Sequence, residues 1–195
     1  LSLPKKVAIQ KEPTKAPMAA EKTKTLPKEA PPVANQNPID NIRELFQKAI
    51  AIHQQGNLPE AKELCNQMIA LDPKSFDAYH FLGIMAVQEK QMELASKMLT
   101  IAVEINSRVP QVHNNLGVIL RSLGQFEKAL DCVIKAVQLN PNYAEALNNQ
   151  GVLYRDLGRY PLALKSFEDA LKLKPEYEDA KSNYEALLKL QADQK

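Results

Sequence analysis

The six glycines of this 195-residue chain constrain its fold more than any other feature, because they recur at a fixed distance. They form two series in steps of 34 residues, one with Gly83, Gly117 and Gly151 and the other with Gly56, Gly124 and Gly158. In the second series one position, residue 90, is not glycine. A constant period of roughly 20 to 50 residues indicates a stack of one repeated supersecondary unit. The sequence therefore predicts a repeat protein built from 34-residue units.

Alanines and prolines follow the same period and indicate what each unit contains. The recurring residues are Ala61, Ala95, Ala129 and Ala163, then Ala102, Ala136 and Ala170, and finally Pro73, Pro141 and Pro175. Small residues at matching positions allow two helices to approach closely, and glycine fits the left-handed turn between them. Apolar residues recur at helical spacing between the turns. We therefore expect eight helices in four hairpins over about residues 42–175.

The repeated residues resemble the signature of the tetratricopeptide family. The third unit carries Leu116, Gly117, Leu120, Gly124, Ala129, Val133, Ala136 and Pro141, and the fourth carries Gly151, Tyr154, Gly158, Ala163, Phe167, Ala170 and Pro175. The resemblance implies an all-α fold, an alpha-alpha superhelix that is a right-handed solenoid of four hairpins. It also implies a concave groove lined by the first helix of each hairpin. The repeats are expected at about residues 42–75, 76–109, 110–143 and 144–177.

A last helix over residues 178–192 is expected to cap the array. Glu185 stands where the glycines of the first series would place their next member. A charged side chain there prevents a further helix from packing closely, so the helix solvates the apolar end of the solenoid. The repeat domain is thus predicted to span residues 41–192.

Residues 1–40 differ from the rest in composition. They hold seven of the 13 prolines and neither glycine nor an aromatic residue. Such a segment buries too little apolar surface to order itself, so we predict a disordered Pro/Lys-rich tether. The chain begins at Leu1, and a preceding anchor stays open. A cytoplasmic location is slightly favoured, with a tethered periplasmic one as the alternative.

The net charge of +2 does not favour nucleic acid as a partner. No apolar run approaches the ~20 residues of a transmembrane helix, so no direct membrane insertion is expected. Cys65 and Cys132 lie two repeats apart and are expected to be unpaired. The glycines follow the repeat instead of forming a nucleotide-binding loop, and the histidines lack the spacing of metal ligands. No cofactor, metal or catalytic residue is therefore expected.

Asparagines recur where they would line the groove. Asn115, Asn149 and Asn183 are spaced by 34 residues, and Asn114 and Asn148 precede the first two. A side-chain amide donates and accepts, so a row of them could pair with the backbone of an extended ligand. The row resembles that of O-GlcNAc transferase-type repeats. The alternative is that the asparagines solvate the inner face.

Two arginines and three aromatic residues complete the candidate site. Arg121 and Arg155 could receive a ligand carboxylate, or could instead pair with nearby acids such as Asp156 or Glu145. Phe46, His80 and Phe81 predict an apolar N-terminal half of the groove.

The function predicted from these features is a non-enzymatic scaffold that binds a partner protein or peptide in its concave groove. One alternative is the substrate-presenting arm of a larger glycosyltransferase-type enzyme. Another is a membrane-tethered assembly factor. Self-association through the apolar inner surface of the first two repeats also stays open.

Overall fold

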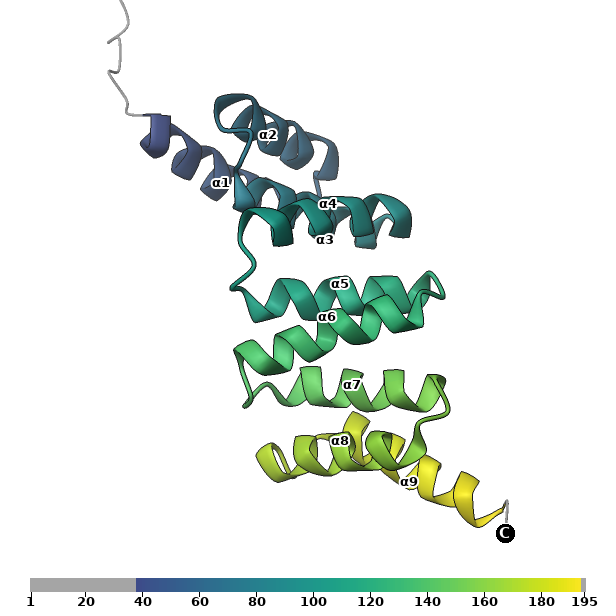
Figure 1. Ribbon diagram of the computed structural model, residues 1–195. Coiled ribbons are helices and arrows are strands. Elements are labelled where there is room, and N and C mark those ends of the chain that lie inside the picture. The colour runs from purple at the N-terminus through teal and green to yellow at the C-terminus, as the bar shows by residue number, and fades with distance from the viewer. Residues whose placement is uncertain (1–37, 194–195) are drawn as a thin grey trace, which may run out of the picture. The chain divides into compact units, whose positions relative to one another are not determined.

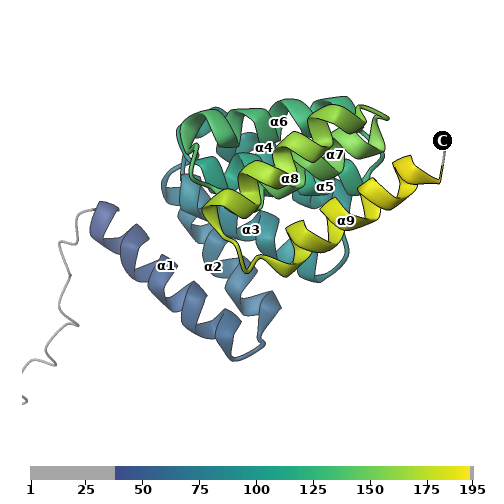
Figure 2. The same cartoon turned by 90° about the horizontal axis from the view of Figure 1, so that it is seen from below.

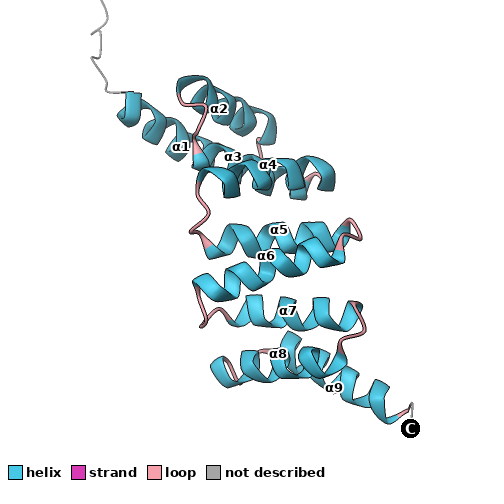
Figure 3. Ribbon diagram, viewed as in Figure 1, coloured by secondary structure: helices cyan, strands magenta, loops and turns pink. Residues whose placement is uncertain are grey.

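The computed structural model describes residues 38–193, which form nine α-helices and no strand (Figures 1 and 3). The helices are α1 (Pro38–Gln54), α2 (Leu58–Leu71), α3 (Phe76–Gln88), α4 (Met92–Ile105), α5 (Pro110–Ser122), α6 (Phe126–Leu139), α7 (Ala144–Asp156), α8 (Tyr160–Leu173) and α9 (Glu178–Ala192). The predicted four hairpins and the final helix are confirmed. Residues 1–37, which make up most of the predicted tether, lie outside the described residues. Its last three residues, 38–40, form the first turn of α1, where a proline is tolerated because that N–H has no helical partner.

The helices pack in hairpins that stack in chain order (Figures 1 and 2). The closest packing is within each pair, α1 with α2, α3 with α4, α5 with α6, and α7 with α8. The second helix of one pair contacts the first helix of the next. In addition, α5 contacts α7 directly, and α7 contacts α9. The odd-numbered helices of the C-terminal half therefore share one surface of the stack.

The first glycine series allows the two helices of a hairpin to touch. A Cβ atom on Gly117 would lie 2.5 Å from Cγ2 of Val133 and 3.0 Å from the carbonyl oxygen of Ala129. Gly83 and Gly151 face Leu99 and Phe167 in the same way. The absence of a side chain thus sets the distance between the helices.

The second glycine series closes the turn between those helices. Gly56, Gly124 and Gly158 have φ angles of 81°, 73° and 72°. In the second repeat Lys90 adopts the same conformation with φ 60°. The fold therefore imposes a left-handed backbone even where the sequence departs from glycine.

Each repeat buries the same positions, and the buried residues of the described chain form four clusters along the stack. Leu99, Val133 and Phe167 are almost completely buried, one in each of three successive hairpins. Leu187 of α9 packs with Phe167 and covers the C-terminal end. Cys65 is buried and Cys132 partly buried, and both are free thiols. Burial raises the pKa of the Cys65 thiol to about 11, so it remains protonated near neutral pH.

Candidate functional site

The asparagines on the odd-numbered helices pair with one another. Nδ2 of Asn149 donates to Oδ1 of Asn114 over 2.9 Å, which joins α7 to α5. One repeat later, Nδ2 of Asn183 donates to Oδ1 of Asn148 over 3.0 Å, which joins α9 to α7. Asn114 and Asn148 are buried. We call these two hydrogen bonds the amide rungs. The first connects the third and fourth hairpins, and the second connects the fourth hairpin to α9.

A tyrosine accompanies each amide rung. Asn114 forms a side-chain contact with the hydroxyl of Tyr143, and Asn148 forms one with Tyr177. Burial is the main cause that raises the pKa of Tyr143, the Glu145 carboxylate adds to it, and the Asn114 hydrogen bond opposes it. Burial also raises the pKa of Tyr177, with Asp179 as the next cause. Both tyrosines are therefore neutral hydroxyls at neutral pH and can share hydrogen bonds with the amides.

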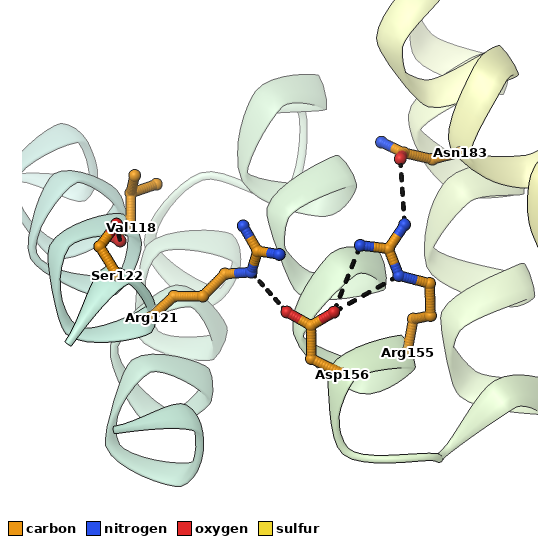
Figure 4. A network of polar contacts seen from close by, with 6 residues as sticks. All are labelled: Val118, Arg121, Ser122, Arg155, Asp156 and Asn183. Atoms are coloured by element: carbon orange, nitrogen blue, oxygen red, sulfur yellow. Dashed lines mark hydrogen bonds and ion pairs between the residues drawn. The ribbon is translucent and has the colours of Figure 1, made fainter. Parts of the chain in front are cut away.

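Arg121 and Arg155 share one carboxylate, that of Asp156 (Figure 4). Nε of Arg121 on α5 donates to Oδ2 of Asp156 over 2.5 Å. Nη2 of Arg155 donates to Oδ1 of Asp156 over 3.2 Å, and its Nη1 donates to Oδ1 of Asn183 over 3.3 Å. Of the two pairings considered from the sequence, the contact is with Asp156. Glu145 instead accepts from Nζ of Lys174 over 3.5 Å.

A polar pocket of about 310 Å³ surrounds these arginines. It is lined by Arg121, Asn148, Val152, Arg155, Asp179, Ser182 and Asn183. The Arg121 side chain is 41% exposed, and its two Nη atoms have no hydrogen-bond partner among residues 38–193. A guanidinium in this state can donate two further hydrogen bonds to a carboxylate. Asp179 places a second negative charge at the α9 side of the pocket.

A second pocket, of about 280 Å³, is apolar and is formed by residues of α3 and α5 together with one residue of α4. It is lined by Ile84, Val87, Gln88, Leu99, Asn115, Val118 and Ile119. Its aliphatic residues are not among the candidate site residues named from the sequence. The 34-residue step could have found them, because Val87 takes the position of Arg121 and Arg155, and Ile84 that of Val118.

Phe46, His80 and Phe81 lie outside both pockets. Phe46 meets Phe81 edge to face at a centroid distance of 5.8 Å, and Phe81 meets His53 at 5.1 Å. His80 lies 5.7 Å from the ring of Phe76 in its own helix. Phe46 and Phe81 pack against the core of the first hairpins. The apolar pocket thus lies between α3 and α5, whereas Phe46 and Phe81 meet between α1 and α3.

His113 has a structural partner, because its Nε2 lies 2.9 Å from the carbonyl oxygen of Ser107 and can donate to it. Within the described part of the chain, no group of three or more His, Cys, Asp or Glu side chains is arranged to hold a metal ion. Among the same residues, no helix has both the length and the apolar character that crossing a bilayer requires.

Comparison with known proteins agrees with the repeat pattern. The sequence model of the tetratricopeptide repeat family matches residues 108–176, which contain α5 to α8. Helices α5 to α8 form tetratricopeptide repeats. No curated protein sequence matches the chain significantly.

Solved structures match the tetratricopeptide solenoid over most of the chain. The MamA protein is 18% identical, with 78% of this chain and 84% of MamA covered and a TM-score of 0.73. PilF of Pseudomonas aeruginosa is 24% identical, with 81% and 72% covered and a TM-score of 0.71. YrrB, a tetratricopeptide protein described as having an unusual peptide-binding site, is 22% identical, with 80% and 84% covered and a TM-score of 0.70. At these identities the likeness establishes the fold.

Proposed function

We propose that this chain is a non-enzymatic interaction module that binds an extended segment of a partner protein along its odd-numbered helices. The observation that carries the proposal is the pair of neighbouring pockets, one apolar and one polar, that share helix α5. An extended peptide presents side chains and backbone amides at short intervals, so it can use both kinds of surface at once. The peptide-binding site for which YrrB is described gives a precedent on the same fold.

We call the surface formed by the odd-numbered helices the binding face. Under the proposal its residues have two different roles. Asn115, Arg121 and Arg155 are expected to contact the ligand, since they line the pockets and are partly exposed. Asn114 and Asn148 are buried in the amide rungs and are expected to hold α5, α7 and α9 at fixed spacing. The row of asparagines noted in the sequence would then serve mainly to position the helices.

Selection of displayed peptides against the full chain tests the proposal. Peptides from a random 12-residue library should be enriched, and hydrogen exchange in their presence should slow on α3, α5 and α7. Slowing confined to α4, α6 and α8, or the absence of any enriched peptide, would contradict it. As a second measurement, Asn115→Ala should weaken binding while the circular dichroism spectrum stays unchanged.

A second candidate function, the substrate-presenting arm of a glycosyltransferase-type enzyme, is favoured by the 34-residue spacing of Asn115, Asn149 and Asn183. It would use the same face, with the amides contacting the substrate backbone. A catalytic domain in a longer reading frame that includes this chain would support it. Equal capture of substrates by the chain and by its Asn115→Ala variant would count against it.

A further inference from the structure

We call the region where two successive odd-numbered helices lie next to each other a joint. The α3–α5 joint lacks the amide rung that is found at the α5–α7 and α7–α9 joints. At the positions that hold Asn114, Asn149 and Tyr143, the preceding repeat has His80, Asn115 and Val109. Nε2 of His80 is buried and has no hydrogen-bond partner among the described residues. Direct packing of α3 on α5 is also weaker than that of α5 on α7 or α7 on α9. This joint is therefore the least tightly closed of the three.

The apolar pocket lies at this open joint. Leu99, which is 1% exposed, belongs to its lining, as do Val87 and Val118, which are 37% and 42% exposed. No charged residue lines it. An engineered apolar cavity of about 150 Å³ takes up benzene. A pocket of about 280 Å³ therefore has room for one leucine, methionine or phenylalanine side chain.

The helix that contributes Val118 to the apolar pocket, α5, also carries Arg121 of the polar pocket. Arg121 follows Val118 by three residues, which corresponds to about 4.5 Å along the axis of α5. Its Nε is held by Asp156, while both Nη atoms remain without a partner among the described residues. The other charged residues of the polar pocket lie on later helices, Arg155 on α7 and Asp179 on α9. Arg121 is therefore the charged residue of the polar pocket that is closest in sequence to the apolar pocket.

We infer that the apolar pocket at the α3–α5 joint is the anchor subsite of the binding face, the place where one side chain of the ligand is buried. Its occupant is an extended peptide of a partner protein that carries a leucine, methionine or phenylalanine, with an aspartate or glutamate two or three residues away. The apolar side chain enters the pocket, the carboxylate accepts from Nη of Arg121, and Asn115 pairs with the peptide backbone. This inference rests on the proposed function, since it names the ligand of the same face.

The test uses the full chain and a defined set of fluorescein-labelled nine-residue peptides. One position is Leu, Phe or Ser, another position two or three residues later is Glu, Gln or Lys, and the remainder is Gly and Ser. The apolar–Glu members should bind best in fluorescence anisotropy. Replacing the apolar residue by Ser should weaken binding at least about tenfold, because about 1.4 kcal/mol corresponds to a factor of ten and a buried aliphatic side chain exceeds that.

Two variants assign the preferences to the site. Val118→Lys should remove the preference for Leu or Phe, and Arg121→Gln should remove the preference for Glu while the apolar preference stays. Leu94→Lys is the matched control, because Leu94 on α4 is also 42% exposed and lies outside the pocket. Each variant is checked for folding by its thermal transition.

The outcomes separate this inference from the proposed function. If displayed peptides bind but neither Val118→Lys nor Arg121→Gln alters the preference, the anchor subsite is wrong while the module still binds peptides. If no peptide of either kind binds, both proposals fail. If sedimentation reveals a self-associated chain that Val118→Lys dissociates while peptide binding is unchanged, the occupant is a second copy and the inference is wrong.

Discussion

Lys90 shows at the scale of one residue how the repeat overrides local preference. It is the one non-glycine residue of the described chain with a positive φ. A left-handed backbone costs a side-chain-bearing residue roughly 1–2 kcal/mol. Lys90→Gly removes that cost but gives the unfolded chain more freedom. We expect a net gain of about 0.5–1 kcal/mol in the free energy of unfolding, measured by urea denaturation.

Lys90→Ala is the control for that prediction. It removes the charge and the long side chain but keeps a Cβ atom in the left-handed conformation. It should therefore leave the free energy of unfolding within about 0.5 kcal/mol of the wild type. A gain from alanine equal to that from glycine would show that the backbone conformation is not the cause.

His80 gives a second prediction, on the missing amide rung. His80→Asn places an amide opposite Asn115, as at the next two joints, and removes the buried Nε2 without a partner. A new hydrogen bond contributes about 1 kcal/mol to the free energy of unfolding. We expect His80→Asn to be more stable by about that amount in urea denaturation at pH 7.5. An unchanged or lower value would mean that the joint cannot accommodate the rung.

The pH dependence of the same variant has a definite sign. Burial lowers the pKa of His80 below its ordinary 6.5, and the nearby Asp77 opposes this only in part. As pH falls through 6.5, the unfolded chain binds a proton at this residue before the folded chain does. Stability is therefore lost on acidification. The advantage of His80→Asn should grow between pH 7.5 and 5.5, and a difference that shrinks would contradict this.

At the scale of elements, the distance between the helices of one hairpin depends on the absence of a side chain. In Gly117→Ala the new Cβ would lie 3.0 Å from the Ala129 carbonyl oxygen, which is backbone and cannot rotate away. Overpacking of this kind costs roughly 1–3 kcal/mol. We expect a lower thermal midpoint, with faster hydrogen exchange in α5 and α6. Val133→Ala, which also loses core packing, should be less harmful in the Gly117→Ala background than alone, because the closest contact is with Val133 Cγ2.

The helices themselves could be predicted from the sequence, because they depend on local information. Glycine at the turns within hairpins, proline at the turns between hairpins and small residues at the crossing points mark the helices and the hairpins, and the last helix spans Glu178–Ala192. The pairing of side chains between hairpins could not be predicted. Asn149 and Asn114, 35 residues apart, meet only because the stack brings α7 beside α5.

At the scale of the whole molecule, α9 serves as the C-terminal cap. Leu187 is 1% exposed and packs with Phe167, so removal of residues 176–195 would uncover an apolar end. In a solenoid each repeat contacts only its neighbours, so the damage should be local. We expect the truncated chain to exchange amide hydrogens faster in α7 and α8 than in α1 to α4. Equal acceleration in all helices would show that the array unfolds as one unit.

The sequence by itself determined the architecture of this protein, and the tertiary structure decided what its face offers to a partner. The 34-residue step fixes where helices turn and touch, since those constraints act within one hairpin. The stack decided that four of the candidate asparagines, Asn114 with Asn149 and Asn148 with Asn183, pair with one another. It also decided that Arg121, held through Nε by Asp156, lines a polar pocket on the helix that also lines the apolar one. Those properties depend on distances between side chains of different repeats, which are set only when the hairpins pack.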